Sequence, residues 1–71
     1  MGFYILSAEL SKNNKVCRTD IITYVVCDKK EAIDKANKDK VCFINRFPEL
    51  KPKNFTLYNA NINSKERFVV I

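Results

Sequence analysis

The sequence predicts a small α+β domain in which two β-strands, one α-helix and two further β-strands follow one another, in the order ββαββ. Four segments are rich in β-branched and aromatic residues, a helical period of apolar residues occupies the middle of the chain, and turn-forming residues separate these segments. With 71 residues, of which 46% are hydrophobic, the chain has room for a single domain, residues 1–71. We expect an antiparallel sheet of about four strands with the helix packed on one face.

The first two strands form a predicted β-hairpin. Residues 3–10 read FYILSAEL and residues 16–27 read VCRTDIITYVVC, and the polar cluster SKNNK separates them. Successive side chains of a strand point to opposite faces, so one set in the first strand is expected to face the core. This set is Tyr4, Leu6, Ala8 and Leu10.

A helix is predicted to begin after Asp28. This residue can cap the helix N-terminus, and Glu31 stands three residues later, where the reciprocal partner of a capping box belongs. Pro48 ends the helix, because the residue before a proline is disfavoured in the α conformation. The apolar residues that share one helical face and are expected to cover the sheet are Ala32, Ile33, Ala36, Phe43, Ile44 and Phe47. Lys40 falls inside this face, so a break of the helix near Lys40 is the alternative.

The last third of the chain predicts a loop and a second hairpin. Residues 48–54, PELKPKN, contain two prolines and no periodicity, which is typical of a loop. Residues 55–62, FTLYNANI, alternate as a strand does, and Asn63-Ser64-Lys65 can form a turn. Residues 67–71, RFVVI, are predicted to be the final strand.

The composition argues against catalysis and against a metal site. The chain has no His and a single Gly, so it contains neither a His-activated nucleophile nor a glycine-rich phosphate loop. Its acidic residues are scattered, and Cys17, Cys27 and Cys42 lack the paired spacing of zinc ligands. We expect no enzymatic activity, no cofactor, no metal and no small-molecule substrate. We expect the three cysteines to pack as small apolar residues.

The location expected from the sequence is the cytoplasm. No apolar run approaches the roughly 18 residues that a membrane span needs, and no export signal opens the sequence. The odd number of cysteines favours reduced thiols. The Lys, Asn and Ile content is typical of AT-rich coding sequences, such as those of small phage accessory genes.

Positive charge is unevenly distributed along the chain. Residues 28–40 hold five lysines against four acidic residues, a net charge of +1, which is typical of a solvated helix face. Residues 41–71 hold five cations against two carboxylates, a net charge of +3. This excess indicates one possible function, a nucleic-acid-binding module in which cations contact phosphates and Tyr58 or Phe55 stacks on bases. Its predicted cations are Arg46, Lys51, Lys53, Lys65 and Arg67.

A second segment favours a different function. Residues 21–26, IITYVV, are apolar on both faces of the predicted strand, although one helix can cover only one face of the sheet. The uncovered apolar face would mark an interaction surface. The residues predicted to form this protein interface are Phe3, Ile5, Ile22, Tyr24 and Val26. We therefore predict a non-enzymatic protein-binding module, an inhibitor, antitoxin-like or regulatory accessory protein, whose partner is a second copy of itself or a larger target.

Overall fold

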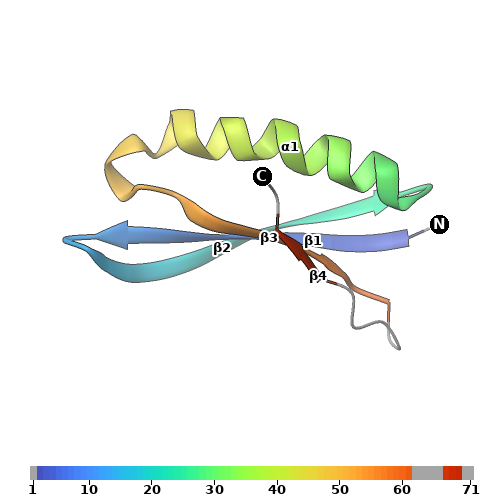
Figure 1. The fold of residues 1–71 in the computed structure, drawn as a ribbon, viewed down its shortest axis with the longest axis horizontal. Helices are drawn as coiled ribbons and strands as arrows, with labels where there is room; N and C mark the ends of the chain where they lie inside the picture. Colours follow the sequence, from blue (N-terminus) through green and yellow to red (C-terminus); the bar gives the residue numbers. More distant parts are fainter. Residues whose placement is uncertain (1, 62–66, 70–71) are drawn as a thin grey trace.

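A computed structural model describes residues 2–61 and 67–69 of the chain. Three long strands and one helix form a small α+β domain of the order ββαβ. They are β1 (Gly2–Lys12), β2 (Lys15–Val26), α1 (Lys29–Arg46) and β3 (Lys53–Asn59). The three strands make an antiparallel sheet, and α1 lies across one of its faces (Figure 1). The predicted α+β class with one covering helix is confirmed.

Two short elements complete the described chain. The 3-10 helix η1 (Pro48–Leu50) connects α1 to β3, and the three-residue strand β4 (Arg67–Val69) pairs with β3. The order of strands across the sheet is β2-β1-β3-β4, so β2 is an edge strand. β4 begins where the last strand was predicted, while the predicted turn Asn63-Ser64-Lys65 and residues 70–71 lie outside the described residues.

The helix begins with the predicted cap in a shifted form. The carboxylate of Asp28 accepts a hydrogen bond of 2.8 Å from the backbone N–H of Glu31. The Glu31 carboxylate reaches back to the backbone N–H of Cys27, at 3.0 Å, one residue earlier than in the usual capping box. Both bonds satisfy donors at the start of the helix, so the local sequence explains why the helix begins here.

The helix continues through Lys40 without interruption, so the alternative of a break there is wrong. The Nζ atom of Lys40 lies 5.5 Å from the centre of the Phe55 ring, so the long side chain runs along the edge of the core. At the other end, the backbone N–H of Phe47 donates to the carbonyl of Phe43, at 3.0 Å, directly before Pro48.

The core lies between α1 and the sheet. The predicted core face of the first strand is confirmed, because Tyr4, Leu6, Ala8 and Leu10 are all buried. The other buried apolar residues are Tyr24, Val26, Ala32, Ala36, Phe43, Phe55 and Leu57. Ile44 was predicted to join them but is exposed. Within the described residues, no helix is long and apolar enough to cross a membrane.

A β-bulge decides which face of β2 is buried. On the turn side of the bulge, Ser11 lies opposite Val16; on the other side, Leu10 lies opposite Arg18. Cys17 is therefore an extra residue in β2, and its thiol lies 3.4 Å from the carbonyl oxygen of Leu10. One extra residue shifts the register by one, which moves every later side chain of β2 to the opposite face.

Candidate interaction surfaces

The five residues of the predicted protein interface lie on two different faces of the sheet. Tyr4 lies opposite Tyr24, so the even-numbered side chains of this part of β2 face the helix. Tyr24 and Val26 are buried in the core, with 7% and 3% of their surface exposed, and Ile22 packs at the core margin. Phe3 and Ile5 belong to the other face. The prediction that all five share one open face is wrong, because the bulge reverses the faces of β2.

The face that α1 leaves uncovered nevertheless carries apolar side chains. This surface, called the open face below, consists of Phe3, Ile5, Ile21, Val25 and Tyr58. Phe3 lies directly opposite Val25, and Ile5 lies opposite Tyr58. The exposed fraction is 61% for Ile21, 57% for Val25 and 48% for Phe3. Ile21 and Val25 were missed as interface residues, although they stand in the same two-faced segment that indicated an interface.

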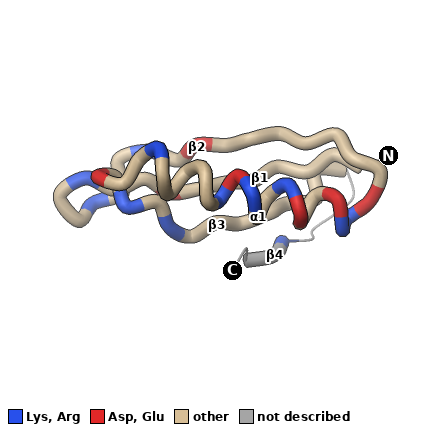
Figure 2. Tube along the Cα trace, turned by 90° about the horizontal axis from the view of Figure 1, so that it is seen from above, with Lys and Arg blue, Asp and Glu red and all other residues tan. Residues whose placement is uncertain are grey.

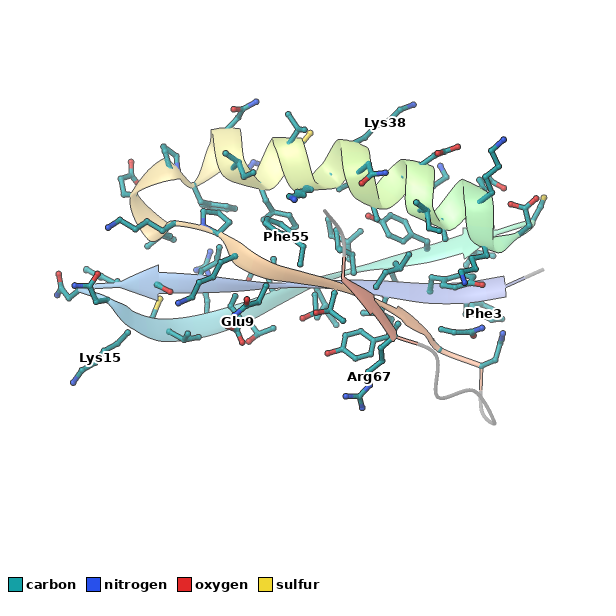
Figure 3. All side chains as sticks on the ribbon, in the orientation of Figure 1. Phe3, Glu9, Lys15, Lys38, Phe55 and Arg67 are labelled. Carbon is teal, nitrogen blue, oxygen red and sulfur yellow. The ribbon has the colours of Figure 1, made fainter. Side chains whose placement is uncertain are left out.

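Tyr58 and Arg67 form one margin of the open face. The guanidinium carbon of Arg67 lies 5.2 Å from the centre of the Tyr58 ring, which is a cation–π distance. Arg67 is exposed and extends from β4 on the side of the sheet away from α1 (Figure 3). Both residues were predicted to bind nucleic acid, and the structure brings these two together on the open face.

Three other predicted cations, Arg46, Lys51 and Lys53, lie toward the end of the molecule that holds the β1–β2 turn, where Figure 2 shows Lys and Arg gathered. This basic end, as it is called below, consists of Arg46, Lys51 and Lys53 together with two hairpin residues that were not predicted, Lys12 and Lys15. Lys53 lies opposite Glu9 of β1, and Lys12 lies opposite Lys15 at the turn. Phe47, which follows Arg46, lies against Arg18 of β2.

The five cations of the basic end stand against two nearby carboxylates, Glu9 and Glu49 of η1. Glu9 accepts a hydrogen bond of 2.6 Å from the neutral side chain of Asn54, which leaves its charge in place. Asp20 pairs with Arg18, at 3.2 Å. The excess of cations gives the basic end a positive surface.

Two other predicted nucleic-acid contacts do not belong to this surface. Phe55 is buried, and its ring centre lies 6.0 Å from that of Phe43. It cannot stack on a base, so that expectation is wrong. Lys65 lies outside the described residues.

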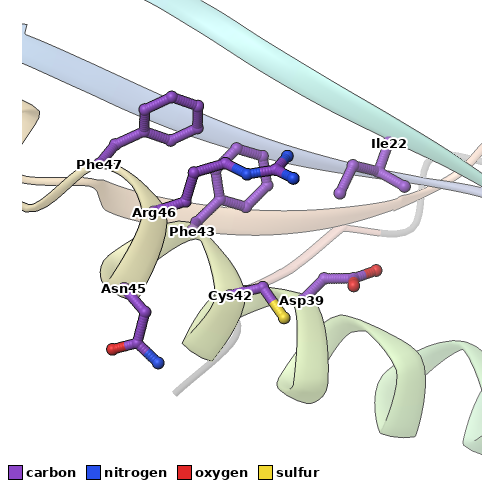
Figure 4. Close-up of a pocket in the computed structure, with 7 residues that line it drawn as sticks. All are labelled: Ile22, Asp39, Cys42, Phe43, Asn45, Arg46 and Phe47. Atoms are coloured by element: carbon purple, nitrogen blue, oxygen red, sulfur yellow. The ribbon is translucent and has the colours of Figure 1, made fainter.

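A groove of about 620 Å³ lies between the C-terminal half of α1 and β2 (Figure 4). Its lining residues are Ile22, Asp39, Cys42, Phe43, Asn45, Arg46 and Phe47. Across residues 2–61 and 67–69, no three metal-ligating side chains gather into a group.

The cysteines do not pack as predicted. Cys17, Cys27 and Cys42 are free and exposed. Their positions explain the difference, because one is the extra residue of the bulge, one precedes the helix cap and one lies at the groove.

No model of a known protein family, no curated protein and no solved structure matches this chain. The open face and the basic end are therefore the features from which a function is inferred.

Proposed function

We propose that the chain is a non-enzymatic protein-binding module that contacts its partner through the open face. The observation that carries the proposal is the exposure of Ile21, Val25 and Phe3 on a sheet whose opposite face is packed under α1. A contiguous exposed apolar surface on a small domain usually marks an interaction site. Burying one such side chain fully contributes about 1.5 to 3 kcal/mol, so a few of them supply the centre of an interface.

The margins of the open face indicate the chemistry of the partner. Arg67 places a positive charge beside the ring of Tyr58, and Thr23 and Thr56 supply polar groups next to the apolar residues. Tyr and Arg are the residue types that often anchor interfaces. The partner is a protein with an apolar ridge and an acidic residue placed to meet Arg67. The proposed binding module includes the fourth strand and has the order ββαββ, because Arg67 lies on β4.

An inhibitor, antitoxin-like or regulatory role fits a module of this kind, because its effect depends on occupying a surface of another protein. Three exposed and unpaired thiols support an action in the cytoplasm. Binding through the open face requires a complementary shape and apolar surface area, and it requires no catalytic side chain.

The test is a quantitative capture experiment with matched surface variants. The wild-type chain, Ile21→Lys, Phe3→Lys and a control, Val41→Lys, are immobilised at equal density and exposed to extract of the source cells. Val41 is an exposed apolar residue of α1, so its substitution adds the same charge on the opposite side of the molecule. We expect a protein that the wild type and the control retain and that both open-face variants release. Equal retention by all four chains, including retention of nothing, would overturn the proposal.

A second candidate function, nucleic-acid binding, is favoured by the basic end. Cations from the first hairpin and from the α1–β3 connection gather there (Figure 2). Such a surface can bind phosphates and release counterions, which supplies most of the non-specific affinity for nucleic acid.

Titration of labelled single- and double-stranded oligonucleotides at two salt concentrations tests this candidate. Binding should fall steeply with salt, and the double variant Lys51→Glu, Lys53→Glu should weaken it and flatten the salt dependence. Lys38→Glu is the control, because Lys38 is exposed on the outer side of α1 (Figure 3). Equal binding by the double variant and the control, or no binding at low salt, would exclude the basic end as a nucleic-acid site.

A further inference from the structure

The two edges of the sheet differ in how well they are protected against pairing with another chain. β4, at one edge, has three residues, whereas β2, at the other, has twelve and pairs only with β1 among the described residues. A long, open edge strand exposes a row of unpaired backbone groups, and proteins usually blunt such edges with short strands, charges, proline or bulges. β4 is short. β2 needs another form of protection.

The uncharged part of β2 has none of these protections. Residues 21–26, IITYVV, contain no charge, no proline and no glycine. The bulge lies at the other end of the strand, at Cys17, as do the charged residues Lys15, Arg18 and Asp20. A six-residue segment with high β propensity and no charge pairs readily when it is exposed at an edge.

The hydrogen-bond pattern shows which backbone groups of β2 point outward. The N–H of Ala60 donates to the carbonyl of Phe3, at 2.7 Å, so the backbone groups of Phe3 face β3. Backbone groups alternate in direction along a strand, so those of Tyr4 face β2 and meet those of Tyr24. It follows that the N–H and C=O groups of Ile21, Thr23 and Val25 point away from the sheet.

We propose that β2 pairs with β2 of a second copy of this chain, antiparallel, about a twofold axis at Thr23. In this register Thr23 lies opposite its own copy, and Ile21 lies opposite Val25 of the other chain. The outward groups of these three residues then form about six backbone hydrogen bonds. Both helices lie on the same side of the extended sheet, and the two open faces become continuous.

The paired segment has no charge conflict in this register. Among positions 19–27 the one charged residue is Asp20, which lies opposite Val26 of the second copy. Ile21 and Val25, which are 61% and 57% exposed in the single chain, lie opposite each other on both sides of the axis. Pairs of β-branched side chains across two strands are favourable, and no like charges oppose them here. This self-complementarity is the reason that a second copy, rather than an unrelated strand, is the proposed occupant.

Sedimentation over a range of protein concentrations tests the pairing. We expect a monomer–dimer equilibrium for the wild type and for Ile44→Lys, which adds a charge to the exposed side of α1. Thr23→Pro removes an outward N–H, a change that edge strands tolerate, and should weaken dimerisation at least about tenfold. Thr23→Lys places like charges next to each other on the axis and should also weaken dimerisation. This variant provides the test if Thr23→Pro fails to fold. A wild type that stays monomeric at all concentrations, or a folded Thr23 variant that dimerises normally, would overturn the proposal.

Disulfide trapping tests the register. In a background with Cys17, Cys27 and Cys42 changed to Ser, the Thr23→Cys variant should form a symmetric disulfide-linked dimer on mild oxidation, because its Cα atoms lie within disulfide range on the axis. Ile44→Cys is the matched control at an exposed position of α1 and should cross-link much more slowly. Equal rates for the two variants would contradict the register.

The inference does not depend on the proposed function, because backbone groups of β2 make the pairing whereas side chains of the open face make the contact with a partner. Ile21 and Val25 belong to both, so the deciding variants are at Phe3 and Thr23. Phe3→Lys changes the open face on β1 and leaves the β2 edge intact, so this variant should lose the captured partner and still dimerise. Folded Thr23→Pro should lose the dimer and keep the apolar residues of the open face. The two variants therefore separate a failure of the proposed partner binding from a failure of the proposed dimer.

Discussion

The hydroxyl group of Tyr24 on β2 donates a hydrogen bond of 2.5 Å to Oδ2 of Asp39 on α1. This contact joins the edge strand to the helix, and Asp39 also lines the groove between them. Burial raises the pKa of Tyr24 above its ordinary value of 10.0, and the hydrogen bond and the negative charge of Asp39 act in the same direction. The folded protein therefore favours the neutral phenol.

This relationship predicts a loss of stability in alkaline solution. A group whose pKa is higher in the folded state stabilises the protein fully below the unfolded-state pKa, near 10, and this stabilisation is lost as the pH rises above that value. Urea unfolding of the wild type should show a fall in the free energy of unfolding between pH 9 and about pH 11. Tyr24→Phe should be less stable at pH 8 by about 1 to 2 kcal/mol and should lose less stability over the same pH interval. Parallel pH curves for the two proteins would contradict the assignment.

The shifted capping box predicts the effect of removing either carboxylate. Asp28→Ala should destabilise the protein by about 1 kcal/mol, because the N–H of Glu31 loses its acceptor. Glu31→Ala should cost less, since the N–H of Cys27 is exposed and can bind water. Lys30→Ala, at an exposed position of the same turn, is the control and should change stability by less than about 0.5 kcal/mol. Thermal unfolding followed by circular dichroism measures all three, and equal effects of the three substitutions would contradict the cap.

The β1–β2 turn offers a stabilising substitution. Asn13 and Asn14 have positive φ angles, 54° and 64°, as a two-residue hairpin turn with both central residues left-handed requires. Glycine adopts this conformation without a steric cost, so Asn14→Gly should stabilise the protein by up to about 1 kcal/mol. The same change at Asn37, an exposed position inside α1, should destabilise it by a few tenths of a kcal/mol, about the difference in helix propensity. Urea midpoints that shift in the same direction for both variants would exclude the turn as the cause.

The features that the sequence predicted correctly depend on residues close together in the chain. The Asp28 cap, the end of the helix before Pro48 and the alternating core face of the first strand are all local patterns, and each is present. The α+β class follows from these elements, because a single amphipathic helix between strands must cover a sheet.

The faces of β2 could not be predicted, because they depend on the register between two strands. Residues 21–26 are apolar on both faces, so alternation alone cannot tell which side chains meet the helix. If the Lys12–Lys15 pairing at the turn continued without a bulge, Leu6 would face Ile21, and the odd-numbered residues would be buried. The extra residue, Cys17, places Leu6 opposite Ile22 instead. No turn residue or glycine marks the bulge in the sequence, so three of the five predicted interface residues, Ile22, Tyr24 and Val26, belong to the set that packs under the helix.

The register of β2 can be tested with one substitution made at two neighbouring positions. Val26 has 3% of its surface exposed and Val25 has 57%. Val26→Asp buries a carboxylate without a partner, which costs at least about 3 kcal/mol, and a 71-residue domain has a total stability of only about 4 to 10 kcal/mol. We expect Val26→Asp to be largely unfolded in far-ultraviolet circular dichroism. Val25→Asp should stay folded, losing less than about 1 kcal/mol, because its carboxylate remains in water. It should also weaken capture of a partner through the open face. An unfolded Val25→Asp together with a folded Val26→Asp would mean that the bulge is absent and that the odd-numbered face of β2 packs under the helix.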